Sequence, residues 1–235
     1  MRILVTGSNR GLGFEFVRQY LELGNEVIGT CRTPENADSL QKLKSLYGDN
    51  LTIIQLDVSD IQSIQKTHDE VTGKFNSLDI IINNAGIISG DEKKEYNLGN
   101  LYQEDFMHIL NVNSVAPLLI SEQFLDLLSR GMNPKVLNIS SRMGSIGEKT
   151  GTSHYSYCMS KAALNMASKL LANNLEARGI GVWVIHPGWN RTNMGGQNAP
   201  LDPKDSVTSM IKLLENIAIR KSGKFLNWDG TESSW

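Results

Sequence analysis

The sequence lacks several features that would indicate particular classes of protein. Its only two cysteines, Cys31 and Cys158, form no CxxC pair, so a disulfide framework is excluded and reduced thiols are expected. No window approaches the roughly 20 apolar residues that a membrane-spanning helix needs. The apolar stretch before the first glycine is too short for a signal peptide. We therefore expect a cytoplasmic protein without a membrane segment.

An excess of charge of one sign is also lacking. The 235 residues include 23 Lys and Arg against 25 Asp and Glu, which gives a formal net charge of −2. Neither nucleic acid nor an anionic membrane is therefore expected as the main partner. His68, His108 and His154 have no carboxylate or cysteine at metal-ligand spacing, and no metal site is predicted. His186 follows an apolar run and is expected to be a structural, hydrogen-bonded histidine.

What the sequence does have is a regular alternation of short apolar runs and longer amphipathic stretches. The expected strands are residues 3–6, 26–30, 51–56, 79–83, 135–140, 181–186 and 224–227. The expected helices are residues 12–23, 34–47, 61–75, 103–130, 155–178 and 206–220. Runs such as 80–82 are apolar without alternation, as in a sheet covered on both faces. The pattern predicts one α/β domain over residues 1–235, with a doubly wound, mostly parallel seven-stranded sheet and helices on both faces.

Two polar stretches, 89–101 and 192–203, follow the carboxyl ends of expected strands, where ligands bind in such sheets. Ordinary surface loops are the alternative. We expect 192–203 to act as a lid, and Trp189, Met194 and Tyr96 to line an apolar pocket.

A glycine-rich loop joins the first strand to the first helix. Its Gly-x3-Gly-x-Gly spacing allows a tight turn and a close backbone approach, so that a pyrophosphate can rest on the helix N-terminus. A plain turn is the alternative. The candidate cofactor residues in this loop are Gly7, Ser8, Asn9, Arg10, Gly11, Leu12 and Gly13.

The end of the second strand favours NADP(H) over NAD(H). An NAD site places an acidic residue there, whereas a 2′-phosphate calls for arginine. This chain has Arg32 at that position and no carboxylate before Glu35, and Arg10 offers a second cation. The alternative is that the side chains of both arginines are merely solvated and bind no phosphate.

Tyr157 and Lys161 lie four residues apart and therefore share one face of the expected helix. A nearby cation favours the phenolate, so we expect Lys161 to lower the Tyr157 pKa from about 10 towards neutrality. Chance can also produce this spacing. Pro117 has no N–H for the carbonyl of Asn113, which predicts a kink there and a free carbonyl for a water-mediated proton relay from Lys161. A tolerated kink without a relay is the alternative.

These motifs together resemble the short-chain dehydrogenase/reductase family over essentially the whole chain. The resemblance rests on the loop from Thr6 to Gly13 and on Asn83-Asn84-Ala85-Gly86, Asn113, Ser141, Tyr157 with Lys161, and Pro187-Gly188. Pro-Gly-Trp at 187–189 and the sequence from Asn227 to Trp235 resemble its C-factor/sniffer-like, carbonyl-reductase-related branch. The resemblance implies a Rossmann-like fold and a small carbonyl or alcohol substrate.

The resemblance also implies roles for individual residues. Tyr157 would be the general acid/base, Ser141 would bind the carbonyl oxygen, and Asn113 and Lys161 would complete the catalytic set. Asp57 and Val58 would flank the adenine, and Tyr157 and Lys161 would also contact the cofactor. The remaining cofactor residues would be Asn84, Ala85 and Gly86 against the ribose, and Pro187, Gly188, Asn190 and Thr192 around the nicotinamide and diphosphate.

Two positions depart from the family pattern. Ser141 lies sixteen residues before Tyr157, more than in many family members, so Ser145 is a second candidate for the catalytic serine. Asn190 replaces a branched apolar residue.

The sequence therefore predicts an NADP(H)-dependent oxidoreductase. The alternative is a dinucleotide-sensing signalling protein of the C-factor type with little turnover. A monomer, and a homodimer or homotetramer paired through the helices of Asn113 and Tyr157, all remain open.

Overall fold

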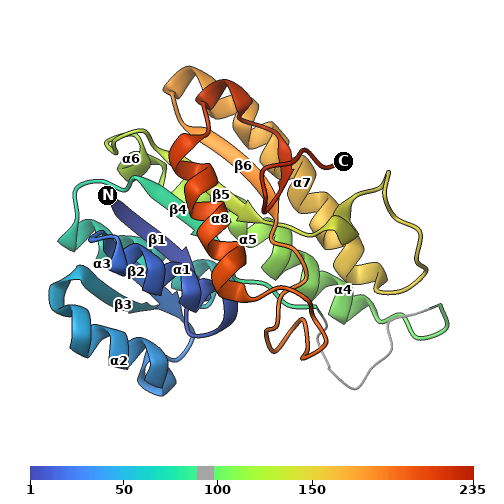
Figure 1. Ribbon diagram of the computed structural model, residues 1–235, viewed down its shortest axis with the longest axis horizontal. Coiled ribbons are helices and arrows are strands. Elements are labelled where there is room, and N and C mark those ends of the chain that lie inside the picture. Colours follow the sequence, from blue (N-terminus) through green and yellow to red (C-terminus); the bar gives the residue numbers. More distant parts are fainter. Residues whose placement is uncertain (89–97) are drawn as a thin grey trace.

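The computed structural model describes residues 1–88 and 98–235, and its centre is a seven-stranded sheet (Figure 1). The strand order is β3-β2-β1-β4-β5-β6-β7, and every neighbouring pair is parallel. The strands are β1 (Arg2–Thr6), β2 (Glu26–Cys31), β3 (Leu51–Gln55), β4 (Ile80–Asn83), β5 (Lys135–Ile139), β6 (Gly181–His186) and β7 (Phe225–Asn227). The predicted sheet is confirmed, and these strands are parallel throughout rather than mostly parallel.

Helices cover both faces of the sheet (Figure 1). Those on one face are α1 (Gly11–Glu22), α2 (Asp38–Tyr47) and α8 (Pro203–Asn216). Those on the other are α3 (Ile61–Lys74), α5 (Ala116–Gln123), α6 (Leu125–Leu128) and α7 (Tyr155–Leu175). Ile80 and Ile82 pack into the first core, whereas Ile81 packs into the second. Because successive side chains of a strand point to opposite faces, a strand buried on both sides must be apolar at every position.

The predicted helix over 103–130 is interrupted. It consists of α4 (Gln103–Leu110), a π-helical segment η3 (Asn111–Val115), α5 and α6. Pro117 cannot donate to the Asn113 carbonyl, and in η3 the Ala116 N–H bonds the Asn111 carbonyl, five residues back. The predicted break in the regular helix at Asn113 is therefore confirmed.

The predicted bounds of the last helix, 206–220, are wrong. Helix α8 begins at Pro203, because the Asp202 side chain accepts a hydrogen bond from the Lys204 N–H (2.9 Å) and caps the helix. It ends at Asn216. The stretch 192–203, expected to act as a lid, therefore includes the first residue of α8, and its role as a lid stays a prediction.

The chain reverses its direction of winding between β3 and β4, so β1 and β4 are neighbours in the sheet although distant in sequence. The carboxyl ends of β1 and β4 border the topological switch point, where ligands bind in open α/β sheets. No helix in the described parts of the chain is long and apolar enough to cross a membrane.

Candidate active site

Tyr157 and Ser141 meet at the carboxyl edge of the sheet. Ser141 follows β5, and Tyr157 lies in the first turn of α7. Burial raises the pKa of Tyr157 to about 12, although a hydrogen bond with the Ser141 hydroxyl acts in the opposite direction. The Tyr157 side chain is 7% exposed. The phenol therefore holds its proton at neutral pH, next to a second hydroxyl.

Lys161 is buried one turn further along α7. Its ammonium donates to the Ile139 carbonyl (2.9 Å) and lies 5.7 Å from the centre of the Tyr157 ring. Burial lowers the pKa of Lys161 to about 8. The expected lowering of the Tyr157 pKa towards 7 is not found in this arrangement, because burial of the phenol outweighs any effect of a cation that faces the β5 backbone.

Asn113 connects three parts of the site. Its amide nitrogen donates to the Ile87 carbonyl (2.7 Å) and to the Ser160 hydroxyl (3.0 Å), and its oxygen accepts from the Ile87 N–H (2.9 Å). Ser160 in turn donates to the Tyr157 carbonyl (2.8 Å). The side chain of Asn113 thus fixes the segment after β4 against α7. Ser160 was not predicted, because nothing in its sequence context distinguishes it from other helical serines.

The two candidate serines have different surroundings. Ser141 bonds the Tyr157 phenol and accepts from the Met143 N–H (3.1 Å). The Ser145 hydroxyl instead donates to the Trp235 carbonyl (3.3 Å) and accepts from the Glu148 N–H (3.1 Å). Ser145 therefore holds the loop after β5, and Ser141 is the serine that faces the tyrosine.

The glycine loop packs closely against the turn after β4. A Cβ on Gly7 would lie 2.9 Å from the Ala85 Cα, and a Cβ on Gly13 would overlap the Gly7 carbonyl oxygen. The Asn84 amide donates to the carbonyls of Thr6 (2.9 Å) and Gly7 (3.1 Å). This backbone-only surface is what a bound pyrophosphate needs. The buried hydroxyl of Ser8 donates a hydrogen bond to the Thr30 carbonyl (3.0 Å). Ser8 therefore offers only its backbone to a ligand.

The N-terminus of α1 is open to an anion. Arg10 precedes the helix without a capping hydrogen bond from its side chain, and the first turn has no acidic residue. Gly11 faces Thr192 across this opening, at 3.4 Å from a Cβ built on Gly11 to the Thr192 Cγ2. Asn9 and Leu12 lie in the same segment. The uncapped N-terminus of α1 and the glycines of the loop therefore fit a bound dinucleotide.

Arg32 and Asp57 follow the neighbouring strands β2 and β3. Burial disfavours the Asp57 carboxylate, but hydrogen bonds from Ser59 and the nearby charges of Arg32 and His108 hold its pKa below the usual value. Arg10 and Arg32 are exposed and form no ion pair with a described residue. Val58 follows Asp57 and is buried. The structure therefore leaves both guanidinium groups exposed at this edge of the sheet.

The departure at Asn190 has a structural explanation. Its buried side chain donates to the carbonyls of Pro187 (2.7 Å) and Gly188 (3.1 Å). Gly188 has φ +79°, a conformation that favours glycine. The asparagine therefore fixes the turn through hydrogen bonds where an apolar side chain would pack.

Gly86 lies beside both Asn113 and Lys161. A Cβ at this position would lie 3.2 Å from the Asn113 Oδ1 and 3.6 Å from the Lys161 Nζ. The predicted residues of the β4 turn, of η3 and of α7 are therefore brought together at one point.

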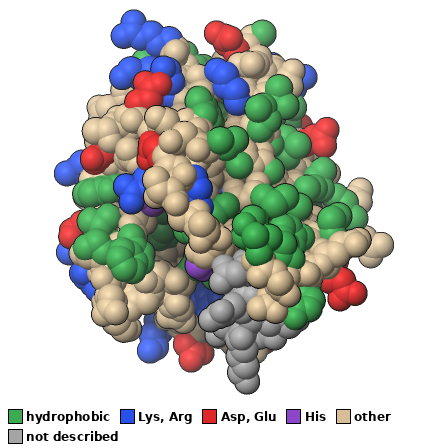
Figure 2. Space-filling model, turned by 90° about the vertical axis from the view of Figure 1, so that its right-hand side faces the viewer, with side chains coloured by type: hydrophobic (Ala, Val, Ile, Leu, Met, Phe, Trp, Pro, Cys, Tyr) green, Lys and Arg blue, Asp and Glu red, His purple; other side chains and the backbone are tan. Residues whose placement is uncertain are grey.

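A hollow lies on the face that carries this edge, bordered by hydrophobic side chains on both sides (Figure 2). Trp189 and Met194, predicted pocket residues, are 56% and 48% exposed. The Trp189 indole N–H donates to the Gly195 carbonyl (2.7 Å), which orders the segment after β6. Tyr96 and most of the 89–101 stretch lie outside the described residues.

His186 differs from the prediction of a fully hydrogen-bonded histidine. Its buried Nδ1 has no hydrogen-bond partner among the residues that the structure describes. Burial, with the Arg142 charge, lowers the pKa of His186 to about 4. No group of three or more His, Cys, Asp or Glu side chains in residues 1–88 and 98–235 is arranged to hold a metal ion.

Sequence reasoning missed the loop after Ser141. Arg142, Glu148 and Lys149 line a cavity beside the end of β5. The loop is held by residues more than 80 positions away, because Gly147 donates to the Trp235 carbonyl (3.0 Å). The only feature of the sequence that could have indicated this cavity is the pair of cationic residues, Arg142 and Lys149, close to the expected serine.

Comparisons with known proteins agree with the fold. The chain is 37% identical over 158 residues to the C-signal protein of Myxococcus xanthus, a match that covers 67% of this chain and 93% of that protein. The NADPH-bound carbonyl reductase from chicken fatty liver has a TM-score of 0.92 and 36% identity, over 100% of this chain and 98% of that one. Carbonyl reductase Sniffer of D. melanogaster has a TM-score of 0.92 and 32% identity, over 100% and 99%. The family model described as short chain dehydrogenase matches residues 1–201, and the chain belongs to this family of oxidoreductases.

Proposed function

We propose that the protein is an NADPH-dependent carbonyl reductase that acts on aldehydes, ketones or quinones. The observation that carries the proposal is the hydrogen-bonded pair of Ser141 and Tyr157 beside buried Lys161, at the edge of the sheet that also holds the glycine loop. The carbonyl reductases among its relatives support the same activity.

The chain's own residues would polarise the carbonyl and deliver a proton. Bound NADPH supplies the hydride. The Ser141 hydroxyl donates to the carbonyl oxygen and stabilises the negative charge that develops there. Tyr157, whose raised pKa keeps it protonated, gives its proton to that oxygen. The Lys161 ammonium then stabilises the phenolate that remains.

The cofactor would lie along the switch point. The glycine loop and the N-terminus of α1 would bind the pyrophosphate, and Arg10 and Arg32 the 2′-phosphate. Asp57 and Val58 would flank the adenine, and Asn84, Ala85 and Gly86 the ribose. Pro187, Gly188, Asn190 and Thr192 would border the nicotinamide.

Replacing the phenol tests the assignment. Tyr157→Phe should lower kcat for NADPH-dependent carbonyl reduction by at least about 100-fold, because the phenol is the group that delivers the proton. Tyr155→Phe is the matched control, since this neighbouring tyrosine is half-buried in the same turn. Loss of NADPH absorbance with a panel of carbonyl compounds is the measurement. A Tyr157→Phe enzyme that keeps most of its activity would contradict the mechanism.

A dinucleotide sensor related to the C-signal protein is the second candidate. Such a function does not require Asn113, Ser141, Tyr157 and Lys161 to be gathered as they are here. Tight NADPH binding without turnover on the whole panel would favour it. For either function we propose a cytoplasmic protein, in keeping with its two free cysteines.

A further inference from the structure

The cavity beside Ser141 has a polar lining. Its volume is about 360 Å³, and it is lined by Arg142, Met143, Glu148, Lys149, Thr150 and Gly151. Met143 is the only large apolar side chain in this set. A pocket for a purely apolar ligand is lined mostly by hydrophobic and aromatic groups. The lining therefore fits a polar or charged part of a ligand.

The two cations of the cavity make no direct ion pair with a described residue. Neither Arg142 nor Lys149 forms an ion pair with a residue in 1–88 or 98–235. Lys149 is half-buried, and its Nζ lies 3.5 Å from the position of a Cβ built on Gly151. The ammonium is thus folded back along the cavity wall rather than extended into solvent.

The one carboxylate in the lining has other partners. Glu148 Oε1 accepts hydrogen bonds from the Ser233 hydroxyl (3.1 Å) and the Ser234 N–H (3.0 Å). The lining as a whole therefore carries two cationic side chains and one carboxylate. An anionic ligand group would therefore meet an excess of one cation, with the carboxylate held on the segment of Ser233 and Ser234.

The loop is also held in place before any ligand binds. The Trp235 carbonyl accepts from the Gly147 N–H (3.0 Å) and from the Ser145 hydroxyl (3.3 Å). Binding to a loop that is already ordered costs less conformational entropy.

The cavity is close to the reacting hydroxyls. Arg142 directly follows Ser141, and neighbouring Cα atoms lie about 3.8 Å apart. The end of β6 lies beside it, because Ile139 pairs with Ile185 and His186 is the next residue. The cavity therefore begins one residue after Ser141 in the chain.

We propose that the carbonyl substrate carries a carboxylate, which Arg142 and Lys149 bind in this cavity while the carbonyl oxygen lies at Ser141 and Tyr157. A guanidinium matches a carboxylate with two parallel hydrogen bonds. The proposal rests on the proposed function and adds a substrate class to it.

A matched pair of substrates tests the proposal. 4-Carboxybenzaldehyde is an anion at pH 7, and its methyl ester is neutral with the same aldehyde. The acid should have a kcat/KM at least about 10-fold higher than the ester, since a charge-assisted hydrogen bond has this magnitude. Arg142→Gln and Lys149→Met should bring the ratio towards one, mainly by raising KM for the acid. Lys212→Gln, at an exposed lysine on α8, should leave the ratio unchanged.

A binding measurement separates this proposal from the reductase assignment. Protein saturated with NADP⁺ is titrated calorimetrically with 4-(hydroxymethyl)benzoate and with its methyl ester. The acid should bind at least about 10-fold more tightly, and Arg142→Gln should remove the difference. Such binding without turnover of any aldehyde would overturn the reductase assignment alone. Equal kcat/KM values and equal affinities for acid and ester would overturn the carboxylate proposal alone.

Discussion

At the scale of single residues, the environment of Tyr157 matters for its role in the proposed reaction. A general acid must hold its proton until the carbonyl oxygen becomes basic, and a pKa of about 12 ensures this at neutral pH. Oxidation of an alcohol needs the opposite form, the phenolate, which is scarce at pH 7. In the proposed mechanism, burial of the phenol therefore keeps Tyr157 in the form that carbonyl reduction needs.

The pH profile of the two directions should differ as a result. Between pH 7 and 9 the phenolate fraction rises about tenfold per pH unit when the pKa lies well above this range, so alcohol oxidation should rise with the same slope. Carbonyl reduction should not rise over this range, because Tyr157 remains protonated. Initial rates of both reactions at saturating cofactor check this. An oxidation rate that levels off near pH 7 would show that Lys161 lowers the phenol pKa in the working enzyme.

Arg32 should decide the choice of cofactor. Arg32→Ala should raise the KM for NADPH at least about 10-fold, since a hydrogen bond to a charged group contributes about 1.5–3 kcal/mol. The KM for NADH, which has no 2′-phosphate, should change little and serves as the internal control. Arg32→Lys should have an intermediate effect, because it keeps the charge without the planar guanidinium. Equal losses with both cofactors would contradict the assignment of Arg32.

At the scale of elements, local patterns predicted the strands well and long-range contacts poorly. The run Ile80-Ile81-Ile82 identified a strand buried on both faces, and Pro117 identified the break in the helix. The sequence could not show that the break is π-helical, because that depends on how η3 packs. The start of α8 was missed although Asp202-Pro203 is a local cap signal.

The candidate site was predictable where a motif carries it. The direction of the Tyr157 pKa shift could not be predicted from the sequence, because the burial that causes it depends on the whole fold. The bonds from Glu148 to Ser233 and Ser234 join segments about 85 positions apart, and no local pattern indicates such a pairing.

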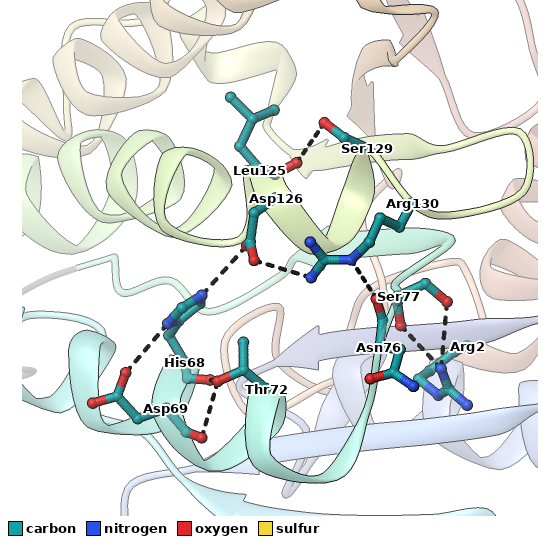
Figure 3. A network of polar contacts seen from close by, with 10 residues as sticks. All are labelled: Arg2, His68, Asp69, Thr72, Asn76, Ser77, Leu125, Asp126, Ser129 and Arg130. Carbon is teal, nitrogen blue, oxygen red and sulfur yellow. Dashed lines mark hydrogen bonds and ion pairs between the residues drawn. The ribbon is translucent and has the colours of Figure 1, made fainter.

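A polar network between α3 and α6 should contribute to stability in a pH-dependent way (Figure 3). Asp126 lies 3.4 Å from His68 and 3.0 Å from Arg130. Burial opposes its ionisation, but hydrogen bonds from Arg130 and His68 hold its pKa below the usual value. A lowered folded-state pKa stabilises the protein above the unfolded-state pKa of about 3.9, and this contribution is lost as the pH falls through the folded-state value.

Asp126→Asn should therefore lower the free energy of unfolding at pH 7 by about 0.5 kcal/mol, a value typical of partly exposed ion pairs. The difference from the parent protein should vanish below about pH 3. Asp69→Asn is the matched control, because Asp69 contacts His68 at the same 3.4 Å but its side chain is 75% exposed. Urea unfolding at several pH values is the measurement. An equal loss at pH 7 and pH 3 would show that the effect is not electrostatic.

At the scale of the whole molecule, α5 and α7 present an apolar surface that the fold itself does not cover. Leu118, Met159, Met166 and Leu170 are 39%, 50%, 63% and 55% exposed. The three residues of α7 follow one another at spacings of seven and four, so they share a face of that helix. Pairing through the helices of Asn113 and Tyr157 is one of the arrangements that the resemblance leaves open, and we propose a second copy of the chain as the occupant of this surface.

Size-exclusion chromatography with light scattering should therefore give a mass of at least twice 26.0 kDa. The double variant Met166→Asp with Leu170→Asp should run as a monomer, because a carboxylate buried in an apolar interface without a partner is strongly unfavourable. Leu46→Asp, at a 73% exposed position on α2, is the control and should keep the parent's mass. Since the substituted side chains point away from the core, the monomer should keep the parent's circular dichroism spectrum. A parent protein of 26.0 kDa at all concentrations up to about 100 µM, far above the dissociation constant of a standard-sized interface, would contradict pairing through α5 and α7.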